Sequence, residues 1–367
     1  DQRIEMSWNN NRFMINGDSW VEEFGRPASD QVIKEKISIL DKFIRSYEMF
    51  TSQINGYGVE TTRKVFEGIL YGFMSPFLCF LRKKFDDRAE LLYKIPIFLI
   101  IAGKPHTGKT HLLRFISLAT GNNEQYYHYS NSNRADVYTS DRAGKNVYRK
   151  ISPQIIDGFL NDNNLYPILV DEVDKAYFSS RNASKPFMGE GFIKEMSNTL
   201  VGLHPVVIGT TNMTFHSDAQ IIKRIYYIQL NSSFVSSKEA EALKHFEEIR
   251  TTFGTELYRD FVFRIEGLIN NGDFVVRGND FLKAGRDIFG LYFEKAGVSK
   301  PDWFSEKLCW DYYERGRMLW QVLYLSKKNK LFNEIVKDNK IVVDLGGDRK
   351  REDYLFYIPP EILIEDK

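Results

Sequence analysis

An eight-residue loop lies between an apolar run and a helical pattern, and it limits the folds that this chain can adopt. Residues Gly103–Thr110 read Gly-Lys-Pro-His-Thr-Gly-Lys-Thr, follow the apolar run Ile95–Ile101 and lead into a helical pattern over Thr110–Ile116. A buried strand, a turn on glycine and a helix N-terminus in that order aim successive backbone N–H groups at one point, where phosphate binds. The pattern therefore predicts a phosphate-binding loop in an α/β fold whose parallel sheet is flanked by helices.

The residue types in this loop suit the parts of a nucleoside triphosphate. Gly103 and Gly108 permit backbone angles and a close approach that a Cβ would block. The Lys109 ammonium is expected to reach the β- and γ-phosphates, and the Thr110 hydroxyl to ligate Mg²⁺. Lys104 occupies a variable position and receives no role. The predicted cofactors are ATP and Mg²⁺. The residues expected to bind the nucleotide from this segment are Gly103, Thr107, Gly108, Lys109, Thr110 and His111.

A second apolar run ends in two carboxylates. Residues Tyr166–Val170 lead into Asp171 and Glu172, which places both acids at the carboxyl end of a buried strand. In a parallel sheet, that end lies on the same edge as the phosphate-binding loop. Asp171 is therefore the expected metal residue beside Thr110, and Glu172 is placed to polarise the water that attacks the γ-phosphate.

A third apolar run, Pro205–Gly209, ends in the polar residues Thr210, Thr211 and Asn212. If this strand lies between the other two, the Asn212 amide can hydrogen-bond the attacking water or the γ-phosphate, which makes Asn212 a candidate catalytic residue. An ordinary strand-to-loop transition would carry the same small polar residues. The catalytic interpretation is favoured because the residues at the ends of all three apolar runs would together form one nucleotide site.

The order and spacing of these three motifs resemble the AAA+ branch of P-loop NTPases, over about two hundred residues from residue 90 to residue 300. The matching segments are Gly103–Thr110, Ile168–Lys175 and Val207–Asn212. The resemblance implies an ATPase in which the residues named above bind the phosphates and the metal, activate water and sense the γ-phosphate.

The same resemblance implies two arginines that contact phosphate. One is an arginine finger, offered to the γ-phosphate of a neighbouring subunit; Arg224 is the candidate catalytic residue and Lys223 its rival. Arginine suits this role because its guanidinium stays charged and binds two oxygens at once. A surface arginine that ends a helix is the competing interpretation. The other is a lid arginine that binds nucleotide, for which Arg286 is the candidate and Arg277 competes. A finger that acts in trans implies a nucleotide-dependent homo-oligomer.

The chain divides into four predicted parts. Residues 1–90 form an N-terminal extension, irregular at first and then helical; residues 91–231 form the α/β core; residues 232–300 form a helical lid; residues 301–367 form a C-terminal module. Helical periodicity covers residues 29–47, 61–85, 238–253, 256–270, 279–296 and 301–325.

The C-terminal module has a pattern of its own. Leu331–Val336 resembles a short helix, and Ile341–Leu345 and Tyr354–Ile358 alternate as the strands of a β-hairpin around Gly346-Gly347. Helices followed by a hairpin would suit a winged-helix module whose basic tip, Arg349–Arg351, contacts DNA phosphates. Any solvated turn carries similar charges.

Composition is consistent with a cytoplasmic protein that has no membrane partner. No secretory signal is visible, and the most apolar helical segment, Ile69–Leu81, is shorter than the roughly twenty residues that span a bilayer, so it predicts a core helix. Cys79 and Cys309 lie far apart without metal-ligand spacing, as expected of buried thiols in a reducing compartment. Since 50 Lys and Arg balance 49 Asp and Glu, nucleic-acid contact has to come from a local patch.

Two such patches favour DNA as the cargo, as in replication, transposition, DNA modification or phage defence, with other protein subunits of such a complex as further partners. One is Arg349–Arg351. The other is residues 126–150, which mix tyrosines with Lys and Arg, as single-stranded nucleic-acid sites do; scattered surface charge would look similar. Two other functions stay open. Protein remodelling could use an aromatic pore loop at Lys185–Gly189, and an ATP-switched scaffold would turn over slowly.

Overall fold

The computed structural model describes the chain in several stretches. The described residues are 5–9, 12–16, 27–51, 58–83, 92, 94–121, 126–129, 138–140, 147–151, 153–160, 166–173, 190–212, 224–230, 232–276, 280–308, 320, 323–325, 332–337, 340–344 and 362–364.

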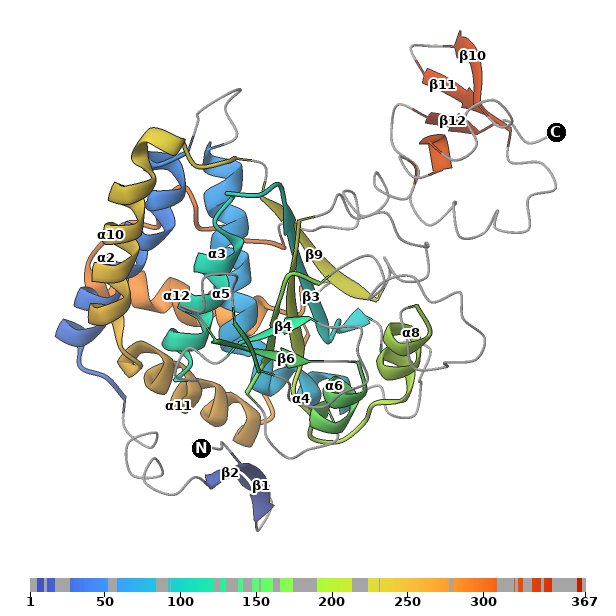
Figure 1. Ribbon diagram of the computed structural model, residues 1–367. Coiled ribbons are helices and arrows are strands. Elements are labelled where there is room, and N and C mark those ends of the chain that lie inside the picture. Colours follow the sequence, from blue (N-terminus) through green and yellow to red (C-terminus); the bar gives the residue numbers. More distant parts are fainter. Residues whose placement is uncertain are drawn as a thin grey trace.

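A seven-stranded sheet forms the centre of the protein (Figure 1), with the strand order β5-β6-β4-β7-β8-β3-β9. All neighbours from β6 to β9 pair in parallel, and β5 pairs antiparallel with β6 at one edge. The predicted α/β fold with a parallel sheet is therefore confirmed. The strands are β3 (Phe98–Gly103), β4 (Tyr127–Tyr129), β5 (Tyr138–Ser140), β6 (Val147–Ile151), β7 (Ile168–Asp171), β8 (Val207–Thr211) and β9 (Ile225–Leu230).

The three strands that carry the motifs are buried along their whole length. Every residue of β3, β7 and β8 is buried, which explains why they read as continuous apolar runs. Phe98 lies opposite Val207 on one side and Ile225 on the other, so β3 runs between β8 and β9 in the same direction. The strand β8 lies between β3 and β7, as predicted. The carboxyl ends of the three strands consequently meet at one edge of the sheet.

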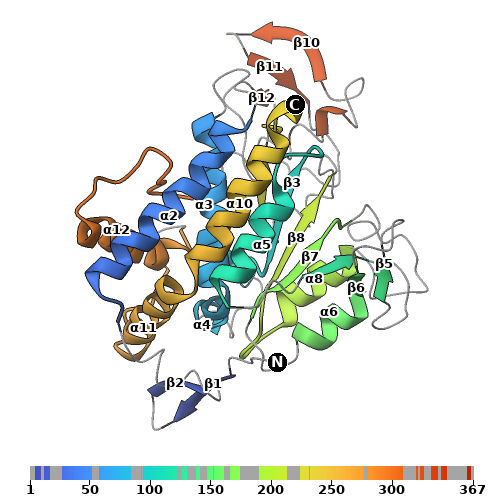
Figure 2. The same cartoon turned by 60° about the vertical axis from the view of Figure 1, so that its left-hand side comes forward.

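Helices cover one face of this sheet in two layers (Figure 2). The helices α3 and α5 pack on the strands and on each other, and α2 and α10 pack on these two helices. The helix α12 contacts α2 and α3, and α11 contacts α2 and α12. The helices are α2 (Asp30–Met49), α3 (Gly58–Met74), η2 (Ser75–Phe77), α4 (Leu78–Lys83), α5 (Lys109–Ala119), α6 (Pro153–Leu160), α8 (Glu190–Thr199), η4 (Ser236–Lys238), α10 (Glu239–Phe253), α11 (Glu256–Asn270) and α12 (Lys283–Ala296).

One hydrophobic core joins these layers. It extends from Ile33 on α2 to Phe304 after α12 and includes all the motif-bearing strands. The helices predicted for residues 29–47, 238–253 and 256–270 are confirmed, and α12 begins four residues later than the predicted residue 279. This core crosses the predicted boundaries at residues 90, 231 and 300. It therefore does not mark where one domain ends and the next begins, and the boundaries stay predictions.

The most apolar helical stretch is internal. Residues Glu60–Lys83 are long and apolar enough to cross a membrane, but the whole of their most apolar window is buried inside the protein. This burial agrees with the prediction that Ile69–Leu81 is a core helix. Cys79 on the same stretch is buried, as predicted.

Arg82, in the last turn of α4, connects three parts of the core. Its side chain is 1% exposed and donates to the carbonyls of Leu92 and Ile95, just before β3, at 2.9 and 3.1 Å. It also donates to the carbonyls of Ser197 and Leu200, at the end of α8, at 3.2 and 2.9 Å. Arg82→Met keeps the apolar stem but leaves four buried carbonyls without this donor. We expect the free energy of unfolding to fall by about 3 kcal/mol, measured by urea denaturation.

The matched control for this prediction is Lys34→Met, which removes the same charge from an exposed position of α2. We expect that variant to lie within about 0.5 kcal/mol of the wild type. Equal stability of Arg82→Met and Lys34→Met would contradict the role given to Arg82.

The N-terminal end of the chain differs from the prediction. β1 (Glu5–Asn9) and β2 (Arg12–Asn16) form an antiparallel hairpin in a segment predicted to be irregular. Apolar residues alternate with polar ones in β1, at Met6 and Trp8, which is the strand pattern that the prediction missed.

The C-terminal end needs two corrections. Leu331–Val336 was predicted as a helix but is strand β10 (Phe332–Lys337), because pairing with β11 (Lys340–Val343) overrides a weak helical pattern. The predicted hairpin is also rearranged: β11 pairs antiparallel with β10 and parallel with β12 (Ile362–Ile364). Tyr354–Ile358, the predicted partner strand, lies outside the described residues.

The helix predicted for residues 301–325 is also wrong at its start. Residues 301–308 form turns and bends and not a helix. Residues 309–319 lie outside the part of the chain that the structure describes.

Candidate phosphate and metal site

The loop after β3 forms a cradle whose two glycines leave no room for a side chain. A Cβ on Gly103 would lie 2.7 Å from the Leu230 carbonyl oxygen and 2.7 Å from Thr107 Oγ1. A Cβ on Gly108 would lie 2.7 Å from the Tyr47 ring, and the Gly108 φ of 83° is in the left-handed region. Gly108 is also the N-cap of α5, so the helix N-terminus opens into the cradle. Both glycines therefore have the structural role that the sequence predicts.

Lys109, the first residue of α5, folds its side chain back over the loop. Its Nζ donates to the carbonyls of Gly103 and Lys104 at 3.0 and 2.8 Å and lies 3.4 Å from Thr107 Oγ1. Burial lowers the pKa of Lys109 to about 8, while two nearby carboxylates oppose this shift. At neutral pH the ammonium is therefore charged and bound to neutral carbonyls, which an anionic phosphate oxygen can replace.

Asp171, the last residue of β7, is 3% exposed and is bound by two hydroxyl groups. Thr110 Oγ1 donates to Asp171 Oδ2 at 3.0 Å, and Thr210 Oγ1 donates to Asp171 Oδ1. The structure thus brings the two predicted metal residues, Thr110 and Asp171, into direct contact.

Glu172 and Asn212 follow the ends of β7 and β8 at the same edge of the sheet. Both side chains are exposed and line one pocket with the loop. Glu172 has φ 58°, in the left-handed region, and its N–H donates to Thr210 Oγ1 at 3.0 Å. Backbone conformations of this kind in a residue other than glycine are concentrated at functional sites.

This pocket has a volume of about 360 Å³. The loop and the strand ends form one part of its lining, and the segment before η4, η4 itself and the first turns of α10 form the other. Its lining residues are Pro105, His106, Thr107, Gly108, Lys109, Thr110, His111, Asp171, Glu172, Asn212, Phe234, Val235, Ser236, Glu239, Ala242 and Leu243.

Thr107 and His111, which were predicted to bind the nucleotide, both line the pocket. Thr107 is 1% exposed, and its hydroxyl donates to the Lys104 carbonyl at 3.0 Å. The His111 ring stacks on Phe246 of α10, with the ring centroids 4.5 Å apart and an angle of 15° between the planes. Burial lowers the pKa of His111 to about 4, so the ring is neutral near pH 7. It therefore presents an uncharged surface to the pocket.

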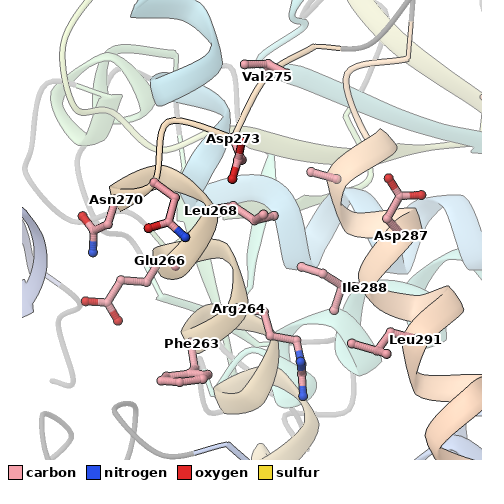
Figure 3. Close-up of a pocket in the computed structure, with 13 residues that line it drawn as sticks. Phe263, Arg264, Glu266, Leu268, Asn270, Asp273, Val275, Asp287, Ile288 and Leu291 are labelled. Atoms are coloured by element: carbon pink, nitrogen blue, oxygen red, sulfur yellow. The ribbon is translucent and has the colours of Figure 1, made fainter.

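A larger cavity of about 860 Å³ lies between α11 and α12 (Figure 3). Its lining carries three carboxylates, on Glu266, Asp273 and Asp287, and burial raises the pKa of Glu266. Its one arginine, Arg264, is paired with Asp260. Carboxylates repel a triphosphate. We therefore assign the nucleotide to the smaller pocket because of its lining residues, although its volume is smaller.

Three residues that shape the smaller pocket received no role from the sequence. Thr210 binds the acidic turn after β7, as described above. The Tyr47 hydroxyl donates to the Gly108 carbonyl at 2.8 Å, and the Phe234 N–H donates to the His106 carbonyl at 2.8 Å. No spacing rule connects Tyr47 on α2 or Phe234 before η4 with the loop. Of the three, only Thr210 could have been suspected from the sequence, because it lies in the third motif.

Arg224 lies away from this pocket. It directly precedes β9 at the amino ends of the parallel strands, and its Nε donates to Asn198 Oδ1 at 3.4 Å. The phosphate-binding loop lies at the opposite, carboxyl ends. Arg224 is therefore not part of the pocket in its own chain, and its role towards a neighbouring subunit stays a prediction.

Arg286 requires a correction. It was predicted to bind nucleotide from the lid, but its side chain is 2% exposed and paired with Glu67 of α3. It also donates to Asp280 Oδ2 at 2.7 Å and to the Ser305 carbonyl at 3.0 Å. Because these core groups occupy its donors, we assign Arg286 to the packing of α12 on α3.

Several predicted residues lie outside the described part of the chain. They are the rival cations Lys223 and Arg277, the proposed pore loop Lys185–Gly189, and the basic tip Arg349–Arg351. In the basic and aromatic stretch of residues 126–150, the strands β4, β5 and β6 are described, whereas residues 130–137 and 141–146 are not.

The chain matches a protein-family model. The family described as "Aq_aa27 P-loop NTPase domain" matches residues 10–215, which is more than half of the chain. An uncharacterized protein, aq_aa27, of Aquifex aeolicus (strain VF5) is 27% identical over 184 residues, which cover 50% of this chain and 61% of that protein. The chain thus spans less than two thirds of the length of this curated relative.

Solved structures show weaker likeness. A structure titled "SCCmec type IV Cch - active helicase" has 11% identity and a TM-score of 0.38, over 71% of this chain and 48% of that chain. One titled "The X-ray structure of JCV Helicase" has 9% identity and a TM-score of 0.22, over 66% of this chain and 73% of that chain. Likeness at this level says nothing about activity.

Proposed function

This chain belongs to the Aq_aa27 P-loop NTPase domain family, and from that premise we propose that it binds ATP with Mg²⁺, hydrolyses the γ-phosphate and acts as an AAA+ type ATPase on DNA. The observation that carries the nucleotide part is the meeting of three strand ends around one pocket. These ends supply Lys109 and Thr110, then Asp171 and Glu172, and finally Asn212. A phosphate ligand, a metal ligand, a base and an amide donor are the groups that phosphoryl transfer to water requires.

The donor set suits Mg²⁺. The Thr110 hydroxyl and the Asp171 carboxylate are hard oxygen ligands with their oxygens 3.0 Å apart. Among the described residues, no group of three or more His, Cys, Asp and Glu gathers as an all-protein metal site. Mg²⁺ fits this pattern, because it takes one or two protein ligands and completes its shell with water and phosphate. When bound, Mg²⁺ neutralises charge that develops on the phosphates.

The residues of the chain have separable tasks in this reaction. The Lys109 ammonium exchanges its loop carbonyls for phosphate oxygens when the nucleotide enters. Glu172 accepts a proton from the attacking water, and the Asn212 amide donates to that water or to the γ-phosphate. The wall of η4 and α10 limits the access of bulk water to the phosphates.

The same wall offers a surface for the nucleoside. Leu243 on α10 is 50% exposed and lines the same pocket as the loop, next to the buried Ala242. Because Leu243 is exposed, it does not pack in the hydrophobic core. The flat apolar face of a nucleotide base could cover it. We place the base against Leu243, with the ribose between α10 and the loop.

Leu243→Asp tests this placement. Loss of apolar contact and repulsion of the triphosphate should together lower ATP affinity about tenfold, measured by isothermal titration calorimetry. Val201→Asp is the matched control, since Val201 is 53% exposed on the segment between α8 and β8 and does not line the pocket. If both variants bind ATP as tightly as the wild type, the base lies elsewhere.

DNA is the proposed cargo because of the basic and aromatic composition of residues 126–150. The test is the ATPase rate with and without single- and double-stranded DNA over a range of salt concentrations. We expect a DNA stimulation that falls steeply as salt rises. Stimulation by unfolded protein instead would favour protein remodelling, and tight nucleotide binding with negligible turnover would favour a switched scaffold.

We further propose that ATP drives assembly of a homo-oligomer in the cytoplasm, in which Arg224 contacts the γ-phosphate held by a neighbouring subunit. The location of Arg224 outside its own pocket is compatible with this role. Mass in solution, measured with and without a non-hydrolysable ATP analogue, tests the assembly. A monomer under both conditions would contradict it.

A further inference from the structure

Thr210 occupies a particular place beside the catalytic edge of the sheet. It is the fourth residue of β8 and is 0% exposed. Regular pairing between β7 and β8 ends where Val170 lies opposite Gly209. The side chain of Thr210 therefore lies at the point where the ladder ends and the acidic turn of β7 begins.

The Thr210 hydroxyl makes two hydrogen bonds of opposite sense. It donates its one proton to Asp171 Oδ1 and accepts the N–H of Glu172 at 3.0 Å. Because Thr210 binds Oδ1, Oδ2 is directed towards Thr110, which donates to it at 3.0 Å. One hydroxyl group thus fixes the rotation of the Asp171 carboxylate.

The same hydroxyl also fixes the backbone of Glu172. The left-handed φ of 58° is disfavoured for a residue with a Cβ and has to be held by its surroundings. Two bonds from β8 flank it: the Thr210 hydroxyl accepts the Glu172 N–H, and the Thr210 carbonyl accepts the Val173 N–H at 2.8 Å. The direction of the Glu172 side chain depends on this turn.

We propose that Thr210 is a positioning residue that sets the metal-binding carboxylate of Asp171 and the base Glu172 at the same time. This inference rests on the proposed function. It goes further because it assigns the orientation of both acids to the end of β8, the strand that Asn212 follows. A change at Thr210 should then affect metal use and turnover together.

A buried threonine at a strand end could also serve stability alone. The two roles differ in what Thr210→Val changes, since valine has the same shape but no hydroxyl. For a positioning residue, we expect kcat to fall about 30-fold, with KM for ATP within threefold of the wild type. The Mg²⁺ concentration needed for half-maximal binding of a non-hydrolysable ATP analogue should rise about tenfold. Thr210→Ser should restore both quantities to within threefold.

Two measurements keep this test independent of activity and of folding. Amide hydrogen exchange of Glu172 in the nucleotide-free protein should be at least tenfold faster in Thr210→Val than in the wild type. Thr211→Val is the matched control: Thr211 is the next residue of β8, is also 0% exposed, and points to the other face of the sheet. It should leave the Mg²⁺ dependence and the exchange of the Glu172 amide unchanged.

The outcomes separate this inference from the proposed function. A wild-type protein that binds no ATP would end the proposed function, whereas the exchange measurement would still decide whether Thr210 holds the turn. An active wild type with unchanged kcat and Mg²⁺ dependence in Thr210→Val would overturn the positioning role. So would equal losses in Thr211→Val, or failure of serine to rescue. If the valine variant does not fold, Thr210→Ser compared with Thr210→Ala gives the same contrast of hydroxyl against none.

Discussion

Lys109→Ala is expected to lower the affinity for ATP by about a thousandfold, which corresponds to about 4 kcal/mol. The reason is electrostatic. The ammonium is 6% exposed and reaches into a cradle of main-chain groups, where charge-assisted hydrogen bonds to phosphate contribute roughly 1.5–3 kcal/mol each. Two such bonds are lost in the variant, and the phosphates keep only the helix N-terminus and the metal ion that Thr110 and Asp171 would hold. Titration calorimetry with ATP and Mg²⁺ measures the change.

The control for this variant is Lys104→Ala. It removes the same charge from the same loop, but Lys104 is exposed and its side chain does not line the pocket. We expect its affinity to stay within threefold of the wild type. Thermal unfolding of both variants should be compared, because Lys109 also donates to the Gly103 and Lys104 carbonyls. Equal affinity losses in the two variants would show that net loop charge, and not Lys109 itself, binds the phosphates.

Glu172→Gln is expected to lower kcat by a factor of about 10²–10⁴ and to leave ATP affinity within a few-fold of the wild type. Glutamine has nearly the shape of glutamate and can keep the backbone bond to Thr210, but it cannot accept a proton from water. Binding is preserved because Lys109, Thr110 and Asp171 are untouched. Single-turnover hydrolysis, measured beside equilibrium binding, separates the two effects.

Glu241→Gln is the matched control for this second prediction. It removes the same charge from an exposed position of α10 outside the pocket, and we expect wild-type kcat. Turnover of Glu172→Gln within tenfold of the wild type would mean that another group activates the water. In that case neither the charge nor the basicity of Glu172 would be needed for hydrolysis.

Local chemistry made the centre of this site predictable. The loop Gly103–Thr110 needs glycines for reasons of backbone geometry and steric room, and these requirements are visible in the order of residues. The buried strands carry continuous apolar runs, so their ends could be located, and the polar residues at those ends could be assigned to one edge. The predicted position of β8 between β3 and β7 was confirmed for the same reason.

Side-chain partners that come from distant parts of the chain were not predictable. Arg286 lies in a pattern that suits a nucleotide contact, but burial beside Glu67, 219 residues earlier, determines its role. Only the three-dimensional arrangement shows that Thr210 binds both Asp171 and Glu172. The pairing of β10, predicted as a helix, likewise depends on a partner strand and not on local preference.

The phosphate-binding loop, the acidic strand end and the parallel sheet could be predicted from the order of residues, because each follows from backbone stereochemistry or from the burial of a continuous apolar run. Which cations reach the pocket, which hydroxyl binds the acids and which helix lines the pocket with the loop became visible only in the three-dimensional structure. These depend on directional contacts between segments far apart in the chain, and no local pattern of residues encodes such contacts.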